Sequence, residues 1–184
     1  MYRSMHHLTA IAVLAATPSL ATLPSPTELF HSLKAGQWVQ AEGIPQKDQS
    51  VLCSELKILT GDFLEDEWGA SGIVRSVDLQ KRLVRVHRLA IRPRDQVEYQ
   101  VLKGFSDIKP GVLIDAEGTY MKDGTFLAKE LEDESEKLKR KPEWQNKIQF
   151  IGRIEKLDAG RRTITLMGCG FVISDRTRVK SVLK

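Results

Sequence analysis

GQWVQAEGIPQKDQSVLCSEL, residues 36–56, recurs 75 positions later as GVLIDAEGTYMKDGTFLAKEL, residues 111–131. Over residues 33–57 and 108–132 the two segments share ten identities in 25 positions without a gap. In each copy apolar and polar residues alternate up to the shared Ala-Glu-Gly, a pattern typical of a half-buried strand. A polar turn, QKDQ or MKDG, then leads into a second short alternating stretch. Each copy therefore predicts a β-hairpin.

A weaker similarity joins residues 72–96 to residues 152–176. Few residues are identical, but the apolar positions match, for example Val84 with Ile164. The inward-facing positions change parity near residues 87–90 and 167–170, which predicts a β-bulge or a sharp bend there. Each of these segments predicts about three short strands.

The chain thus runs hairpin, triplet, hairpin, triplet, with a short helix expected before each hairpin. Three strands, a helix and two strands form the plan of an OB-type five-stranded barrel. Residues 72–132 contain the whole plan, and the remaining hairpin and triplet would complete a second barrel. The predicted fold is mainly β: two small OB-like barrels, one contiguous and one closed by the N- and C-terminal segments, with short connecting helices.

The domain boundaries follow from this plan and from the first residues. A basic residue, the apolar run LTAIAVLAA and small residues near position 21 predict a secretory signal peptide. We therefore expect a periplasmic or secreted protein with no membrane span. The expected parts are a signal peptide (1–21), the N-terminal half of the split barrel (22–66), the contiguous barrel (70–133), a charged helical linker (134–147) and the C-terminal half of the split barrel (148–184).

The motif residues of the contiguous barrel carry a resemblance to a known family. The pattern G-x-[VI]-x-x-[VL]-D, then R-x-[IV]-x-[VL], then G-x-x-[VI]-x-A-E-G…D-G-x-[FL]-x-A-x-E-[LI]-E is similar to that of bacterial exported domains of unknown function. The resemblance implies small β-barrels, often in tandem. Its matching residues are turn glycines and core positions, so it implies no catalytic residue. They are Gly72, Val74, Val77, Asp78, Gly111, Ile114, Ala116, Glu117, Gly118, Gly124, Ala128, Leu131 and Glu132.

Reactive side chains do not form a recognisable catalytic or metal-binding pattern. Beyond the predicted signal peptide the only histidines are His31 and His87. No C-x-x-C, H-x-x-x-H or G-x-S-x-G motif occurs. We therefore expect no enzyme activity, no metal and no cofactor.

The most suggestive functional feature is the acid-free stretch KRLVRVHRLAIRPR, residues 81–94. It would occupy strands two and three of the contiguous barrel, the usual ligand face of OB-type barrels. Arginine can bind phosphate or carboxylate with two parallel hydrogen bonds. The stretch predicts binding of an envelope protein or an anionic polymer, by these candidate residues: Lys81, Arg82, Arg85, Arg88, Arg92 and Arg94.

Two alternatives to this function remain open. The basic stretch could bind nucleic acid or polysaccharide, although export and the lack of interleaved aromatic residues argue against nucleic acid. The protein could instead be structural, forming homo-oligomers when its N-terminal hairpin completes the C-terminal triplet of a neighbouring copy by strand exchange. A third explanation of the arginines is that they only solvate the strands and protect their edges.

The two cysteines test the split barrel. Cys53 lies in the first hairpin and Cys169 in the last triplet, so each would belong to one half of the barrel closed by the chain ends. An exported chain meets an oxidising compartment, where an even cysteine count favours a bridge. We therefore expect a Cys53–Cys169 disulfide, with two unpaired buried thiols as the alternative.

Overall fold

The computed structural model describes residues 26–183, and the predicted signal peptide lies outside them. The chain is mainly β, as expected, and no helix in the described range is long and apolar enough to cross a membrane. The first half of the chain contains α1 (Pro26–Ser32), β1 (Trp38–Pro45), β2 (Val51–Thr60), β3 (Trp68–Asp78), β4 (Leu83–Val86), β5 (Leu89–Gln100) and η1 (Phe105–Asp107). The second half contains β6 (Leu113–Tyr120), β7 (Thr125–Asp133), α2 (Glu136–Arg140), η2 (Pro142–Asn146), β8 (Ile148–Arg153), β9 (Lys156–Asp158), β10 (Thr163–Leu166), β11 (Cys169–Val172) and β12 (Arg178–Leu183).

One closed five-stranded barrel lies within residues 68–133, which confirms this part of the prediction. Its strands follow one another in the order β3-β4-β5-β7-β6, and β6 pairs with β3 to close the ring. Among the strand pairs of this barrel, only β5–β7 is parallel. Alternate side chains point inward, and Val84, Ile91 and Phe126 are fully buried. The barrel therefore encloses its own apolar core.

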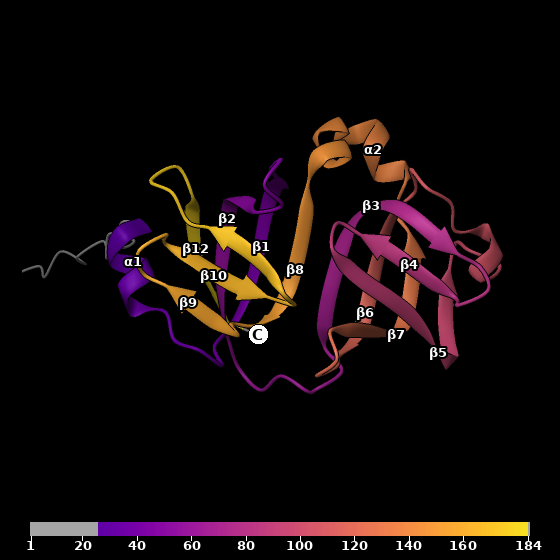
Figure 1. Ribbon diagram of the computed structural model, residues 1–184, viewed down its shortest axis with the longest axis horizontal. Helices are drawn as coiled ribbons and strands as arrows, with labels where there is room; N and C mark the ends of the chain where they lie inside the picture. The colour runs from indigo at the N-terminus through magenta and orange to yellow at the C-terminus, as the bar shows by residue number, and fades with distance from the viewer. Residues whose placement is uncertain (1–25, 184) are drawn as a thin grey trace, which may run out of the picture.

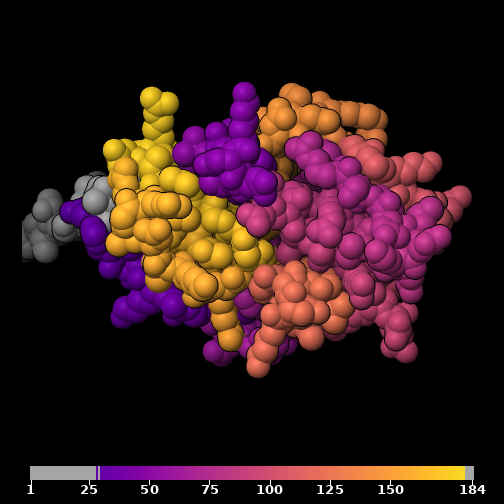
Figure 2. Space-filling view, viewed as in Figure 1, coloured from indigo at the N-terminus to yellow at the C-terminus, as the bar shows by residue number. Residues whose placement is uncertain are grey.

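The remaining strands bring the N-terminal hairpin and the C-terminal strands of the described chain together (Figure 1). β1 pairs with β2 and with β8, so the N-terminal hairpin lies against a C-terminal strand. The far edge of β2 pairs in parallel with β11 and then with β12, while β10 lies between β11 and β9. In Figure 2 the indigo and yellow segments accordingly form one half of the molecule and residues 68–133 the other.

The glycine of the shared Ala-Glu-Gly stands at a β-bulge in both hairpins. The register shifts between Glu42 and Gly43, and again between Glu117 and Gly118. A Cβ atom at Gly118 would lie 2.0 Å from the Leu127 carbonyl oxygen, and one at Gly43 would lie 2.5 Å from that of Leu52. Only glycine lets the two strands of each hairpin approach so closely. The hairpin bulges were not predicted.

Near residues 87–90 and 167–170 the inward-facing positions change parity, as expected, and the cause in both places is a tight turn and not a bulge. Val86 pairs with Leu89, and Leu166 pairs with Cys169, so only two residues connect the strands in each case. His87 has a φ of 51°, in the left-handed region that short hairpin turns use. A two-residue turn reverses the chain and thereby changes which positions face inward.

The two halves of the molecule are joined by strand pairing and by a contact between tilted aromatic rings. β3 pairs with β8 antiparallel, with Ala70 opposite Phe150. Next to this seam the ring of Trp68 lies 5.2 Å from that of Trp38 and 5.6 Å from that of Tyr120, measured between centroids. Gly152 leaves room for Trp68, because a Cβ there would lie 2.3 Å from the indole. The sheet is therefore continuous between the halves.

The predicted Cys53–Cys169 disulfide is wrong: both thiols are free and buried. In the parallel pair β2–β11, Phe171 lies opposite Val51, and extending that register brings Ile173 next to Cys53. Cys169 lies four residues further back, about 13 Å away at the usual rise of a strand, whereas a bridge spans Cα atoms no more than about 7 Å apart. The N-terminal hairpin does pair with C-terminal strands, but in a register that separates the cysteines.

Candidate functional site

Five of the six predicted basic residues are exposed on β4, β5 and the turns beside them. Arg85 and Arg92 project from the outer face of the barrel, Lys81 and Arg82 lie in the turn before β4, and Arg88 lies in the turn between β4 and β5. We call this set the basic stripe: Lys81, Arg82, Arg85, Arg88 and Arg92.

Charge on the basic stripe is largely uncompensated within the described chain. Lys81 forms an ion pair with Asp78 at 3.8 Å, and no other member has an ion pair with residues 26–183. Arg94, the sixth predicted residue, is only half-exposed, and its guanidinium donates to the Thr119 hydroxyl at 2.6 Å. Arg94 therefore binds the barrel itself, and we leave it out of the stripe.

The turn that carries Arg88 reaches the other half of the molecule. The His87 ring nitrogen Nε2 lies 3.0 Å from the carbonyl oxygen of Gln49, in the turn of the first hairpin. A carbonyl can only accept, so Nε2 carries the proton of this bond. Burial, together with the charges of Arg88 and Arg75, lowers the pKa of His87, and the ring stays neutral at pH 7. Arg88 is thereby held next to the turn at residues 46–50.

Between that turn and β9–β11 lies an open groove of about 730 Å³. Its cationic side chains come from both halves of the molecule, and hydroxyl groups line it between them. No aromatic residue contributes to its wall. In Figure 1, β10 beside the groove and β4 of the basic stripe both lie toward the viewer. We call it the inter-half groove, with these polar residues: Ser50, Arg88, Lys156, Arg161, Thr163 and Thr165.

Two carboxylates also line the inter-half groove. Asp48 accepts bonds from the Ser50 hydroxyl at 2.6 Å and from the Ser50 amide at 3.0 Å, which lower its pKa. Both bonds from Ser50 fall on Oδ1, and the Asp48 side chain is exposed, so a ligand can reach Oδ2. Asp158 accepts from the Arg161 amide at 3.0 Å, and its other oxygen lies 3.9 Å from the Arg161 Nε. The groove therefore offers cations, hydroxyls and carboxylate acceptors together.

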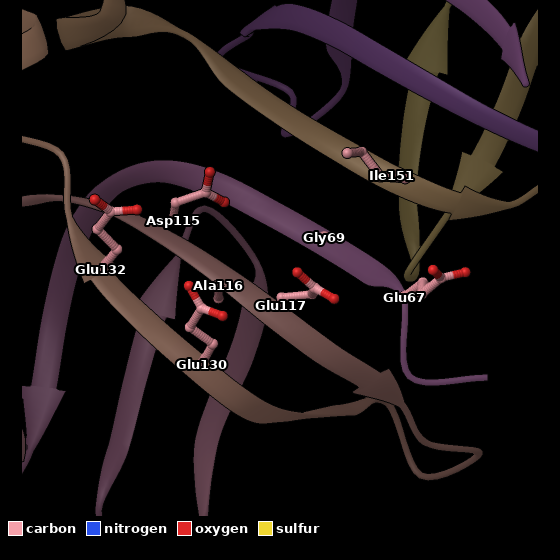
Figure 3. Close-up of a pocket in the computed structure, with 8 residues that line it drawn as sticks. All are labelled: Glu67, Gly69, Asp115, Ala116, Glu117, Glu130, Glu132 and Ile151. Atoms are coloured by element: carbon pink, nitrogen blue, oxygen red, sulfur yellow. The ribbon is translucent and has the colours of Figure 1, made fainter. Parts of the chain in front are cut away.

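A separate acidic cleft borders the seam, with Gly69 and Ile151 in its wall and most of its carboxylates on β6 and β7 (Figure 3). Asp115 is the most enclosed of its carboxylates: burial raises its pKa, although the Ser71 hydroxyl donates to it at 2.9 Å. Burial and then neighbouring carboxylates raise the pKa of Glu130 and Glu132. No group of three or more His, Cys, Asp or Glu in residues 26–183 is placed to hold a metal ion.

The sequence did not single out Lys156, Arg161 or the groove residues from the first hairpin. A signal for them existed, because the alignment of residues 72–96 with 152–176 places Arg161 at the position of Lys81 and Thr165 at that of Arg85. What the alignment could not give is that Arg88 would reach this surface from the other half. His31 lies in α1 and His87 in the turn described above, so the two histidines serve different local structures.

No family model, curated protein or solved structure matches this chain. The geometry of the described residues therefore carries the functional argument.

Proposed function

We propose that this protein is a non-enzymatic binding module of the bacterial cell envelope, which recognises an anionic partner through the basic stripe. The observation that carries the proposal is the set of exposed cations on β4, β5 and their turns, of which only Lys81 forms an ion pair in the described chain. Exposed guanidinium groups without an ion pair in the protein keep their full binding capacity for carboxylate, sulfate or phosphate.

The proposal includes an OB-like type for the closed barrel and a second, similar barrel in the other half. The strand order β3-β4-β5-β7-β6 with its parallel β5–β7 pair supports the first part, since the stripe then covers strands two and three. For the second part, β8 and β9 are separated by two residues, and the Glu155 amide donates to the Thr165 carbonyl at 2.9 Å. That bond connects the β8–β9 link to β10, near the two ends of the strand order β8-β1-β2-β11-β10-β9.

Export to the periplasm or the medium belongs to the same proposal. It is supported by the signal-peptide pattern of residues 1–21 and by the resemblance of residues 72–132 to exported barrel domains. Strand exchange between copies would have to replace the pairings of β1 with β8 and of β2 with β11, which the chain already makes with itself. No observation favours that structural alternative.

The test uses the outward arginines that lie outside the groove. Arg85→Glu/Arg92→Glu should elute from heparin at a much lower salt concentration than wild type, because four units of charge change on the binding face. Lys103→Glu/Lys109→Glu changes the same charge at exposed positions next to η1 and is the matched control. If both variants shift equally, the retention of wild type reflects net charge and the proposed site is wrong.

A further inference from the structure

The inter-half groove and the basic stripe occupy corresponding places in the two halves. Under the alignments of the sequence, Arg161 corresponds to Lys81, Thr165 to Arg85 and Val172 to Arg92. Both surfaces are formed by a strand pair with a two-residue turn, and the pairing of β3 with β8 connects the two halves through corresponding residues, Ala70 and Phe150. The groove is thus the counterpart of the stripe with a changed set of side chains.

Compared with the basic stripe, the inter-half groove has fewer positive charges and more hydroxyl groups. Where the stripe has Arg85 and Arg92, the groove has Thr165 and Val172. Its cations are Lys156 and Arg161, with Arg88 supplied by the other half through the contact of His87 with Gln49. A ligand that fits must carry negative charge but also polar groups able to meet threonine and serine hydroxyls.

The groove carboxylates narrow the ligand further. Asp48 and Asp158 stand among the cations and would repel a densely charged phosphate chain. The same carboxylates can accept hydrogen bonds from ligand hydroxyls, and the Asp48 carboxylate is exposed with both Ser50 bonds on Oδ1 alone. The wall has no aromatic side chain on which a nucleobase could stack. These three features match a chain of sugar units that each bear a carboxylate and free hydroxyls.

We infer that the inter-half groove is a binding subsite for an acidic polysaccharide, so that one chain of uronate-type units occupies the groove and continues onto the basic stripe through Arg88. The inference rests on the proposed function, which it deepens by naming the class of ligand. Carboxylates of the ligand meet Lys156, Arg161 and Arg88, and its hydroxyls donate to Asp48 and Asp158. The stripe supplies charge, and the groove supplies the preference for sugar.

The experiment compares two probes of equal charge, a long galacturonate oligosaccharide and a thymidine oligonucleotide, by titration calorimetry at fixed ionic strength. Wild type should prefer the oligosaccharide. Lys156→Glu/Arg161→Glu should weaken oligosaccharide binding by about tenfold, as expected for the loss of charge-assisted contacts. The oligonucleotide should lose no more affinity for this variant than for the control Lys103→Glu/Lys109→Glu.

A second variant separates recognition of sugar from attraction of charge. In Asp48→Asn/Asp158→Asn the amide oxygens still accept the bonds from Ser50 and from the Arg161 amide, so the turns keep their shape. We expect weaker oligosaccharide binding and stronger oligonucleotide binding. Equal strengthening of both would show that the groove acts by charge alone, and an effect of Lys156→Glu/Arg161→Glu equal to that of the control would show that it is no subsite. In either case the stripe could still bind, whereas a wild type that binds neither probe would overturn the proposed function as well.

Discussion

Gly118→Ala tests the explanation of the shared Ala-Glu-Gly. The added Cβ would lie 2.0 Å from the Leu127 carbonyl oxygen and 2.9 Å from the Ala128 Cα. Both are backbone atoms of β7, the partner of β6 across the bulge, so no side-chain rotation can relieve the contact. The strands must separate locally, which weakens the hydrogen bonds of the barrel and loosens the packing of Phe126 and Leu131 beneath them.

The cost should be near the upper end for an overpacked site, about 3 kcal/mol. For a chain of this size that corresponds to a melting temperature lowered by about 6–12 °C. Urea unfolding measures this loss of free energy. It is followed by circular dichroism, which reports on all strands, and by tryptophan fluorescence, because Trp38 and Trp68 report on the seam.

Gly104→Ala is the matched control. Nothing lies within 4 Å of a Cβ at Gly104, and its φ of 169° is extended backbone that alanine adopts freely. Its unfolding free energy should stay within about 0.5 kcal/mol of wild type. If Gly118→Ala were as stable as Gly104→Ala, the repeated glycine would not be required by strand approach, and the account of the bulge would be refuted.

Two further predictions concern buried ionisable groups. The raised pKa of Asp115 means that its ionised form destabilises the fold, so Asp115→Asn should raise the unfolding free energy at neutral pH. That gain should disappear as the pH falls through the raised pKa towards 3.8, the value for a free Asp. A gain that persisted in acid would contradict the upward shift of the Asp115 pKa. Burial raises the pKa of Cys53 to about 12 and that of Cys169 to about 11, so a thiol reagent at pH 8 should label neither until the protein is unfolded. Rapid labelling of the native protein, or a disulfide in its intact mass, would show that the cysteines are placed differently.

Local patterns of apolar and polar residues were sufficient to predict the strands and their repetition along the chain. Alternating apolar residues around the Ala-Glu-Gly motif were enough to predict both hairpins, because side chains of a strand point alternately inward and outward. The order of strands within residues 70–133 predicted one closed barrel, since short connections leave few ways to pair consecutive strands. The exposure of Arg85 and Arg92 followed from the same alternation.

The register between distant strands depends on tertiary packing, as the positions of the two cysteines show. The sequence placed Cys53 and Cys169 on strands of one half, but the register of β2 with β11 separates them by four residues. Register between strands far apart in the chain depends on packing of the whole sheet, which no local pattern encodes.

The inter-half groove has the same origin. Ser50, Arg88 and Arg161 come from three separate turns, and they meet because β3 pairs with β8 and the His87 ring binds the Gln49 carbonyl. Each residue looks like an ordinary turn residue in the sequence, and its contribution to a binding surface exists only once the two halves are packed together. Local alternation fixes which way a side chain points along its own strand, but long-range pairing fixes which other side chains it meets.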